Sequence, residues 1–575
     1  MLEAIKEIYK HRQDFMIIGL TGRIGSGCST IASYMQKNIN DLSIADVSIA
    51  EDANDDIRKK YIIKKFFQKN WAPFYVIRAS DVILTFILEK DFDTFKTYVL
   101  DKCNLDVSSL QNDFSDMHTK TIEMIEKLKR KISIDEEDDL QLLHEYLEQL
   151  SNLNQQIRKQ LSAHSYRDFT KVFQSIGDNI RLHGAYENDS GEVNPENIYN
   201  ISKRINLIIK AYAKYKQNKN EKAYFVIDAF RNPFEVMFFR ERYSAFYLIS
   251  VNCSEEDRIY RLLNNPSLSL TRDDINAQDE KENPDDLVKD LKSFVSQNIR
   301  ACIEKSDLHI HNSGKHGNSN YNELKGQIIK YISLIQHPGL ITPSRDEKMM
   351  QIAYTAKLNS GCISRQVGAV VTNKQQSLRA IGWNSVPDGQ VACLFRNSDN
   401  LINGHDSSAY SNFEKNNPHF QEKARELKFS PSVESGLNNP FCFKDVKNTI
   451  DVPSSLQSHP AIKKMNNQVY TRALHAEENA FLQMAKYGGD ALEGGTLYST
   501  ASPCELCSKK AYQLGIKRVV YIDPYPGIAR EQILECGETE VTVDLFKGAI
   551  GLAYHKIYDP ILTFKDELKA LSSGI

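Results

Sequence analysis

The chain carries a histidine, a glutamate and two cysteines at a spacing that can hold a metal ion and move a proton. Glu477 follows His475 by two positions, Cys504 follows His475 by 29 positions, and Cys507 lies three further on. One imidazole and two thiolates form the ligand set of a catalytic zinc, which keeps its fourth position open for water. Glu477 is then placed to carry a proton beside that water.

Two alternative interpretations give these residues no catalytic role: a structural zinc ribbon and a Cys-x-x-Cys pair without metal. A ribbon usually needs a second Cys-x-x-Cys pair, and the sequence has none. The order His-x-Glu and then Pro-Cys-x-x-Cys is typical of zinc nucleobase deaminases. We therefore predict hydrolytic attack on C4 of a cytosine ring, which yields uracil and ammonia.

The neighbouring pattern predicts the elements that position these residues. His475 begins a predicted helix, and a strand at 496–500 leads into the helix that begins at the cysteines. Two cysteines at positions i and i+3 of a helix start lie side by side, and the helix N-terminus favours their thiolates. A hairpin at 368–372 and 379–384 and a strand at 518–522 complete the predicted α/β arrangement.

A second group of residues predicts a phosphate-binding loop near the N-terminus. An apolar run at 15–20 leads into a glycine-rich turn, and a helix follows. The pattern is a Walker A loop in which Cys28 replaces the lysine. Backbone binding of phosphate survives this change, but phosphoryl transfer loses electrostatic support. The candidate nucleotide-binding residues are Gly22, Gly25, Gly27, Cys28, Ser29, Thr30 and, at the end of a later strand, Asp228.

This loop predicts a bound nucleotide, with or without Mg²⁺, in a regulatory or degenerate kinase domain. The alternative is a helix start with incidental glycines. Further apolar runs at 224–228, 245–251 and 307–312 alternate with helical stretches, which favours a parallel α/β sheet. We place this kinase-like domain at 1–337 and a second domain at 345–575, with the boundary at the Pro/Gly-rich stretch between them.

Composition narrows the classes of protein. At 575 residues the chain is long enough for two or three domains, and its net charge of −3 argues against a nucleic-acid coat or a polybasic membrane binder. The sequence contains no run of about 18 apolar residues, so it predicts no membrane span. Ten dispersed cysteines and a charged N-terminal stretch favour a reducing, cytoplasmic location without a signal peptide.

Residues of about 345–560 resemble the deoxycytidylate deaminase branch of the cytidine deaminase fold, an α/β/α domain. The matching stretches are 364–370, 382–387, 475–480, 502–507 and 514–521. The resemblance implies that Asn384 and Asn479 contact the sugar and that Arg365 contacts the phosphate of a free deoxycytidine nucleotide. A turn residue before a proline and an ordinary surface arginine are the alternatives for Asn384 and Arg365.

Two features depart from that branch. Its usual Tyr-Asn-Gly stands here as Trp-Asn-Ser at 383–385, and a long polar insert occupies 388–470. Relatives carry a second, structural zinc in this region, and the insert contains Cys393, His405, His419 and Cys442. Their spacing is irregular, so a role in shaping the pocket mouth or an oligomer contact is favoured over a second metal.

A kinase-like phosphate loop followed by this deaminase resembles the bacterial antiviral cytidine deaminases. The resemblance implies deamination of dCTP or dCMP that drains the cytosine deoxynucleotide pool during phage infection, and an off state in the healthy cell. It also implies a homo-oligomer, such as a hexamer, and control by a small inhibitory RNA in some members. A housekeeping dCMP deaminase, a nucleic-acid editor and a non-catalytic sensor are the competing functions. The sequence leaves open the number of phosphates, the ligand of the loop and the activating trigger.

Overall fold

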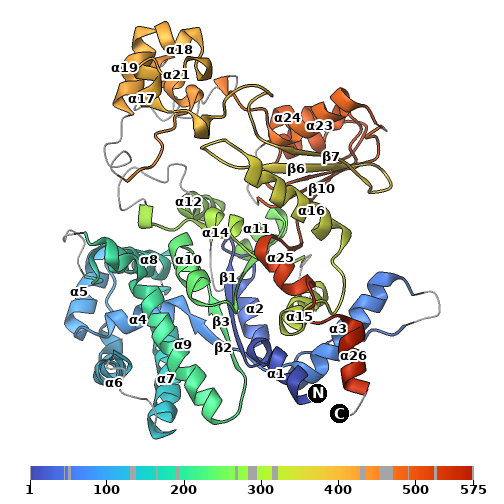
Figure 1. Cartoon of the computed structure of the whole chain (residues 1–575). Helices are drawn as coiled ribbons and strands as arrows, with labels where there is room; N and C mark the ends of the chain where they lie inside the picture. The colour runs from blue at the N-terminus through green and yellow to red at the C-terminus, as the bar shows by residue number, and fades with distance from the viewer. Residues whose placement is uncertain are drawn as a thin grey trace. The chain divides into compact units, whose positions relative to one another are not determined.

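The apolar runs in the first half of the chain pair as parallel strands in the computed structural model (Figure 1). β1 (Phe15–Thr21) lies between β3 (Ala223–Asp228) and β4 (Phe246–Asn252). β5 (Leu308–His311) continues the sheet beside β4. These four predicted strands are confirmed. The sequence pattern missed β2 (Tyr75–Arg78), which has only four residues and leads directly into a helix.

The structure describes residues 2–44, 46–49, 53–129, 137–163, 166–187, 193–265, 270–282, 294–313, 321–427, 435–451, 470–489, 491–523 and 528–572. The α-helices around the first sheet are α1 (Leu2–Gln13), α2 (Cys28–Met35), α3 (Asp55–Asn70), α4 (Ala79–Ile87), α5 (Phe92–Cys103), α6 (Gln111–Lys129), α7 (Glu137–Leu161), α8 (Tyr166–His183), α9 (Asn200–Asn218), α10 (Pro233–Arg242), α11 (Glu255–Leu263), α12 (Arg272–Glu282), α14 (Ile299–Glu304), α15 (Asn322–Gln336), α25 (Gly551–Tyr558) and α26 (Phe564–Ser572). None of the described helices is long and apolar enough to cross a membrane.

Helices cover both faces of the first sheet, and this explains why its strands are apolar at nearly every position. Ile17 faces a core built with α4 to α9, whereas its neighbour Ile18 faces a second core built with α2, α3, α15 and α25. The side chains of successive strand residues point to opposite faces. Each face therefore needs its own apolar set.

The chain divides into two compact units. Unit 1 comprises Met1–Pro343 and Lys547–Ile575, and unit 2 comprises Ser344–Phe546. The second predicted domain extended to 575, whereas its last segment packs in unit 1. The physical reason is β11 (Gly548–Ala549), which adds an antiparallel edge to β5, followed by α25, whose apolar side is buried in the core.

Unit 2 has a five-stranded sheet with helices on both faces. Its strands, in the order in which they pair, are β10 (Thr542–Leu545), β9 (Arg518–Tyr521), β8 (Thr496–Ser499), β6 (Gly368–Thr372) and β7 (Leu378–Trp383). The predicted hairpin is confirmed as the antiparallel pair β6 and β7, and β8 and β9 are confirmed as strands. The sequence pattern missed β10, which pairs with β9.

The helices of unit 2 are α16 (Arg345–Ala356), α17 (Ser398–Ile402), α18 (Asn412–Asn416), α19 (Pro418–Glu426), α21 (Phe443–Asp451), α23 (Ala476–Tyr487) and α24 (Glu505–Gln513). α16 covers one face of the sheet, where Gly368 of β6 lies against the backbone of the helix. α23 and α24 cover the other face, where Ala476, Ala480 and Ala511 join the sheet residues in one core.

The described part of the 388–470 insert forms a small helical cluster with its own core. Phe420 and Phe441 pack at its centre, together with residues of α17, α19 and α21. The guanidinium of Arg396 is fully buried there, paired with Glu414 and stacked 4.6 Å from the ring of Phe441. The insert thus holds a folded subdomain inside unit 2.

Candidate functional site

His475, Cys504 and Cys507 lie together at the N-termini of two neighbouring helices. His475 is the residue that precedes α23, and Cys504 is the residue that precedes α24. The Nδ1 atom of His475 lies 3.3 Å from the Sγ atom of Cys504 and 3.5 Å from that of Cys507. Among the described residues, these three make the only cluster of three or more histidine, cysteine or acidic side chains suited to hold a metal ion.

The chain before His475 is held against the end of the hairpin. Leu474 pairs with Ser385 in an isolated antiparallel bridge, and its N–H donates to the Ser385 carbonyl at 2.8 Å. One turn into α23, the Asn479 side chain donates to the Trp383 carbonyl at 3.0 Å. Both contacts fix the start of α23 beside the end of β7, and His475 is therefore positioned by residues about 90 positions earlier.

The electrostatics of the cluster favour a thiolate. A hydrogen bond from the Cys507 thiol and another from His475 lower the pKa of Cys504 to about 3. Hydrogen bonding to Cys504 in turn raises the pKa of His475. A preformed thiolate beside an imidazole and a second thiol matches the sulfur and nitrogen ligands that zinc takes. The residues present therefore fit a zinc ion with three protein ligands.

Glu477 is buried next to this cluster, with 4% of its surface exposed. The hydroxyl of Ser499, the last residue of β8, donates to its Oε1 atom at 2.8 Å. Burial raises the pKa of Glu477, while the hydrogen bond from Ser499 partly offsets this. The hydrogen bond from Ser499 holds one of the two carboxyl oxygens of Glu477 in place. Sequence reasoning did not find Ser499, because a strand serine carries no signal of its own.

Asn384, Asn479 and Arg365, the predicted substrate residues, lie at the same end of the hairpin, where β6 begins and β7 ends. The Asn384 amide donates to the Arg365 carbonyl and accepts from the Val367 N–H, each at 2.7 Å. Asn384 thus holds the backbone of 365–367 in place. The Arg365 guanidinium donates to Asp523 at 3.1 Å, and this acidic residue is fully buried. Sequence reasoning did not find Asp523, whose role depends on the fold alone.

The four residues of the insert that the sequence analysis weighed as a second metal site do not assemble within the described residues. Cys442 forms a hydrogen bond that lowers the pKa of Cys393 to about 6, so these two thiols are neighbours. His405 and His419 join them in no cluster suited to a metal among the described residues. Part of the insert, 428–434 and 452–469, lies outside the described residues.

A second candidate site is the glycine-rich turn of unit 1, between β1 and α2. Gly25 and Gly27 have φ angles of 79° and 111°, which glycine adopts without strain. α2 begins at Cys28, so its first N–H groups have no partner within the helix and point back toward the turn. Burial, together with the charge of Asp228, raises the pKa of Cys28 to about 12 and keeps its thiol neutral. No cation therefore replaces the missing lysine at this position.

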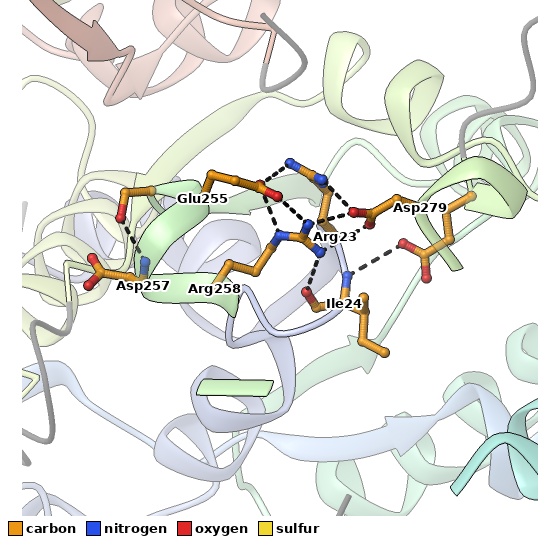
Figure 2. A network of polar contacts seen from close by, with 8 residues as sticks. Arg23, Ile24, Glu255, Asp257, Arg258 and Asp279 are labelled. Atoms are coloured by element: carbon orange, nitrogen blue, oxygen red, sulfur yellow. Dashed lines mark hydrogen bonds and ion pairs between the residues drawn. The ribbon is translucent and has the colours of Figure 1, made fainter. Parts of the chain in front are cut away.

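A network of ion pairs and hydrogen bonds connects this turn to α11 and α12 (Figure 2). Arg23 donates to Glu255 at 2.6 Å and to Asp279 at 2.7 Å. Arg258, which is almost fully buried, donates to the same two carboxylates and to the Ile24 carbonyl. Both arginines are thus committed to carboxylates, and the network holds the turn in one conformation.

Comparison with known proteins identifies unit 2. A family model described as the cytidine and deoxycytidylate deaminase zinc-binding region matches residues 343–523. The deoxycytidylate deaminase of Enterobacteria phage T4 is 30% identical over 179 residues, which cover 31% of this chain and 77% of the phage enzyme. That of phage T2 is 30% identical over 187 residues, covering 31% of this chain and 79% of its own.

Among solved structures, dCMP deaminase from the cyanophage S-TIM5 is similar to this chain. The match covers 36% of this chain and 100% of the cyanophage chain, with 22% sequence identity and a TM-score of 0.19. The family match places the chain among zinc-binding deaminases, which are hydrolases. The chain belongs to the cytidine and deoxycytidylate deaminase family.

Proposed function

We propose that unit 2 removes the 4-amino group of free deoxycytidine nucleotides, dCMP or dCTP, by hydrolysis. The observation that carries this proposal is the buried Glu477 beside the His475, Cys504 and Cys507 cluster. The phage relatives are named as deoxycytidylate deaminases, which supports a nucleotide substrate. A cytosine ring supplies the C4 carbon that water attacks and the amine that leaves.

Each residue has a distinct role in this proposal. His475, Cys504 and Cys507 hold zinc, which supplies Lewis-acid activation of a water molecule when it is bound. Glu477 accepts a proton from this water at Oε2 and delivers it to ring N3 as the water oxygen bonds to C4. It then moves the second water proton to the amine, which leaves as ammonia while the C4 carbonyl forms. Ser499 keeps the carboxyl group in place throughout.

Arg365 is the proposed contact for the substrate phosphate, and Asn384 and Asn479 are the proposed contacts for the sugar. Asp523 orients the Arg365 guanidinium through the 3.1 Å hydrogen bond. An arginine held by a buried carboxylate loses less side-chain freedom when it binds phosphate. The carboxamide of Asn479 already contacts the Trp383 carbonyl, so one of its N–H groups and its oxygen remain for a ligand.

For unit 1 we propose a regulatory, nucleotide-binding role without efficient phosphoryl transfer. The turn between β1 and α2 supports phosphate binding by backbone N–H groups. Ser29 and Asp228, which share a hydrogen bond, are the proposed Mg²⁺ contacts. The neutral Cys28 supplies none of the charge that a lysine gives to the transition state.

In the cell we propose that this enzyme acts in the cytoplasm as a homo-oligomer and depletes the cytosine deoxynucleotide pool during phage infection. An enzyme that drained this pool continuously would be toxic, so the proposal includes an off state. A ligand on unit 1 or a small inhibitory RNA would maintain that state. The two-unit chain, with a 343-residue unit before the deaminase, supports this regulated role over a housekeeping dCMP deaminase.

The test is ammonia release and product chromatography with purified, zinc-loaded protein. dCTP, dCMP, CTP, deoxycytidine and a cytosine-containing single strand are supplied separately, with a Glu477→Gln protein as the blank. Conversion of dCTP or dCMP to its uracil form supports the proposal and fixes the number of phosphates. Conversion of the single strand alone contradicts it and favours a nucleic-acid editor.

A further inference from the structure

A cavity of about 630 Å³ in unit 1 extends from the glycine-rich turn to α7 and α8. Six arginines but only three acidic residues line it. This volume is in the range of sites that bind cofactors and other small molecules. Four of the arginines, Arg23, Arg78, Arg181 and Arg231, lie within ion-pair distance of carboxylates. Arg158 and Arg261 have no such carboxylate among the described residues, and their positive charge favours an anion. The cavity continues well beyond the turn, so a phosphate group alone would leave most of it empty.

Besides the turn, the lining of the cavity includes aromatic and carboxamide side chains, which we call the amide lobe (Asn154, Phe169, Phe173, Gln174 and Gln297). Phe169 and Phe173 stack on each other with ring centroids 4.3 Å apart. Gln174 donates from Nε2 to Oε1 of Gln297 at 3.3 Å. This bond leaves one acceptor on Gln174 and one donor group on Gln297 for a ligand.

Asn154 of the amide lobe has an unsatisfied acceptor. It is 4% exposed, and its Oδ1 atom has no hydrogen-bond partner among the described residues. Its Nδ2 group is already used, because it donates to Ser80 at 2.8 Å and to Asp81. Buried polar atoms in folded proteins nearly always have a partner. A ligand that brings an N–H group into the lobe would satisfy this oxygen.

Two arginines, Arg158 and Arg78, line the same cavity. The guanidinium of Arg158 stacks 4.4 Å above the Phe169 ring and has no carboxylate within ion-pair distance among the described residues. Arg78 lies 3.8 Å from Asp81 and 3.3 Å from Ser151. Burial raises the pKa of Asp81 and of Asp228, and the charges of both arginines lower it. Their positive charge therefore acts both on the carboxyl group that contacts Asn154 and on the one at the end of β3.

We propose that this cavity binds one nucleotide, whose base occupies the amide lobe and whose phosphate groups lie between Arg78, Arg158 and the glycine-rich turn. A nucleobase edge carries donors and acceptors together, which matches the free atoms of Asn154, Gln174 and Gln297. The network in Figure 2 holds the phosphate end in its binding conformation. This inference rests on the nucleotide-binding role proposed for unit 1, and it adds base recognition to that role.

Titration calorimetry on the zinc-loaded full chain tests the inference with tripolyphosphate, ATP, GTP and dTTP as separate probes. We expect at least one nucleotide to bind more tightly than tripolyphosphate. The Gln174→Leu change should weaken that nucleotide roughly tenfold or more, because it leaves a base atom unpaired, and should leave tripolyphosphate affinity unchanged. Gln217→Leu, at an exposed position on α9 outside the cavity, is the matched control.

An Asn154→Leu protein provides a second variant, and thermal unfolding together with deaminase activity confirms that each variant folds. Equal nucleotide affinity in the wild type and both amide-lobe variants would overturn the inference. Tripolyphosphate that binds as tightly as every nucleotide would also overturn it, while leaving the proposed role of the turn intact. Failure of all four probes to bind would reject both.

Discussion

Gly382 of β7 lies directly beneath Ala476, the first residue of α23. A Cβ atom on residue 382 would stand 2.2 Å from the Ala476 carbonyl oxygen and 2.6 Å from the Ala480 nitrogen. Only a residue without a side chain fits this space. Because Ala476 joins His475 to Glu477, this close approach sets the positions of the candidate metal ligand and of the proposed proton carrier together.

Replacing Gly382 with alanine should displace α23 from the sheet. The added methyl group overpacks a closed interface, which costs about 1–3 kcal/mol of stability. We expect a lower Tm and reduced zinc retention, measured by thermal unfolding and by metal analysis after dialysis. Gly326→Ala is the control, since a Cβ atom there meets nothing within 4 Å and alanine favours its helix. Unchanged zinc retention in Gly382→Ala would contradict this account of the site.

Replacing Glu477 with glutamine should remove proton transfer without removing the metal. The variant keeps the size and the Ser499 contact of the side chain but cannot accept a proton. Loss of a general acid–base group lowers kcat by about 100-fold or more. Steady-state ammonia release and zinc content should be measured on the same samples. The matched control is Glu478→Gln, because Glu478 is paired with Lys510 at the surface of α23 and should leave kcat nearly unchanged.

Replacing Cys504 with serine should remove zinc and activity together. Its low pKa supplies the thiolate, and a hydroxyl in its place is a far weaker zinc ligand. Metal analysis should show zinc lost from Cys504→Ser and retained in Cys536→Ser, which changes an exposed cysteine outside the cluster. A Cys504→Ser enzyme with full zinc and full turnover would refute the assigned ligand set. Chelation of the wild type should reproduce the loss, and added zinc should reverse it.

Asp346 should stabilise unit 2 at neutral pH and lose this effect in acid. Burial raises its pKa, but two 2.8 Å hydrogen bonds from Arg518 outweigh burial and hold it below the ordinary 3.8. A folded-state pKa below the unfolded one means that the stabilisation is complete above the unfolded pKa. It disappears as the pH falls through the folded value.

Asp346→Asn should therefore cost about 1–2 kcal/mol at neutral pH, after allowance for partial exposure of the pair. The difference from the wild type should shrink as the pH falls below about 4. Trp383 fluorescence in a Trp71→Phe background reports on unit 2, since the chain has two tryptophans. Asp388→Asn, which changes an exposed ion pair, should have almost no effect at either pH. A pH-independent difference for Asp346→Asn would exclude this linkage.

Local sequence pattern predicted most of the strands, and it named the three residues that lie together at the starts of α23 and α24. The apolar runs at β1, β3, β4 and β5 are buried on both faces, so composition alone marks them. β2 and β10 carry a weaker pattern, because the end residues of β2 are only partly buried and no residue of β10 is fully buried. The return of 547–575 to unit 1 had no signal either, because it depends on the open edge of β5.

The sequence by itself determined the donor set, since metal chemistry depends on residue types and on spacing within two helix starts. His475, Cys504 and Cys507 could be named for that reason. The tertiary structure alone decided which groups hold two other candidate site residues in place: Ser499 on the carboxyl group of Glu477, and Asp523 on the guanidinium of Arg365. These partners lie 22 and 158 positions away, and such contacts exist only after strand pairing and helix packing have closed the distance.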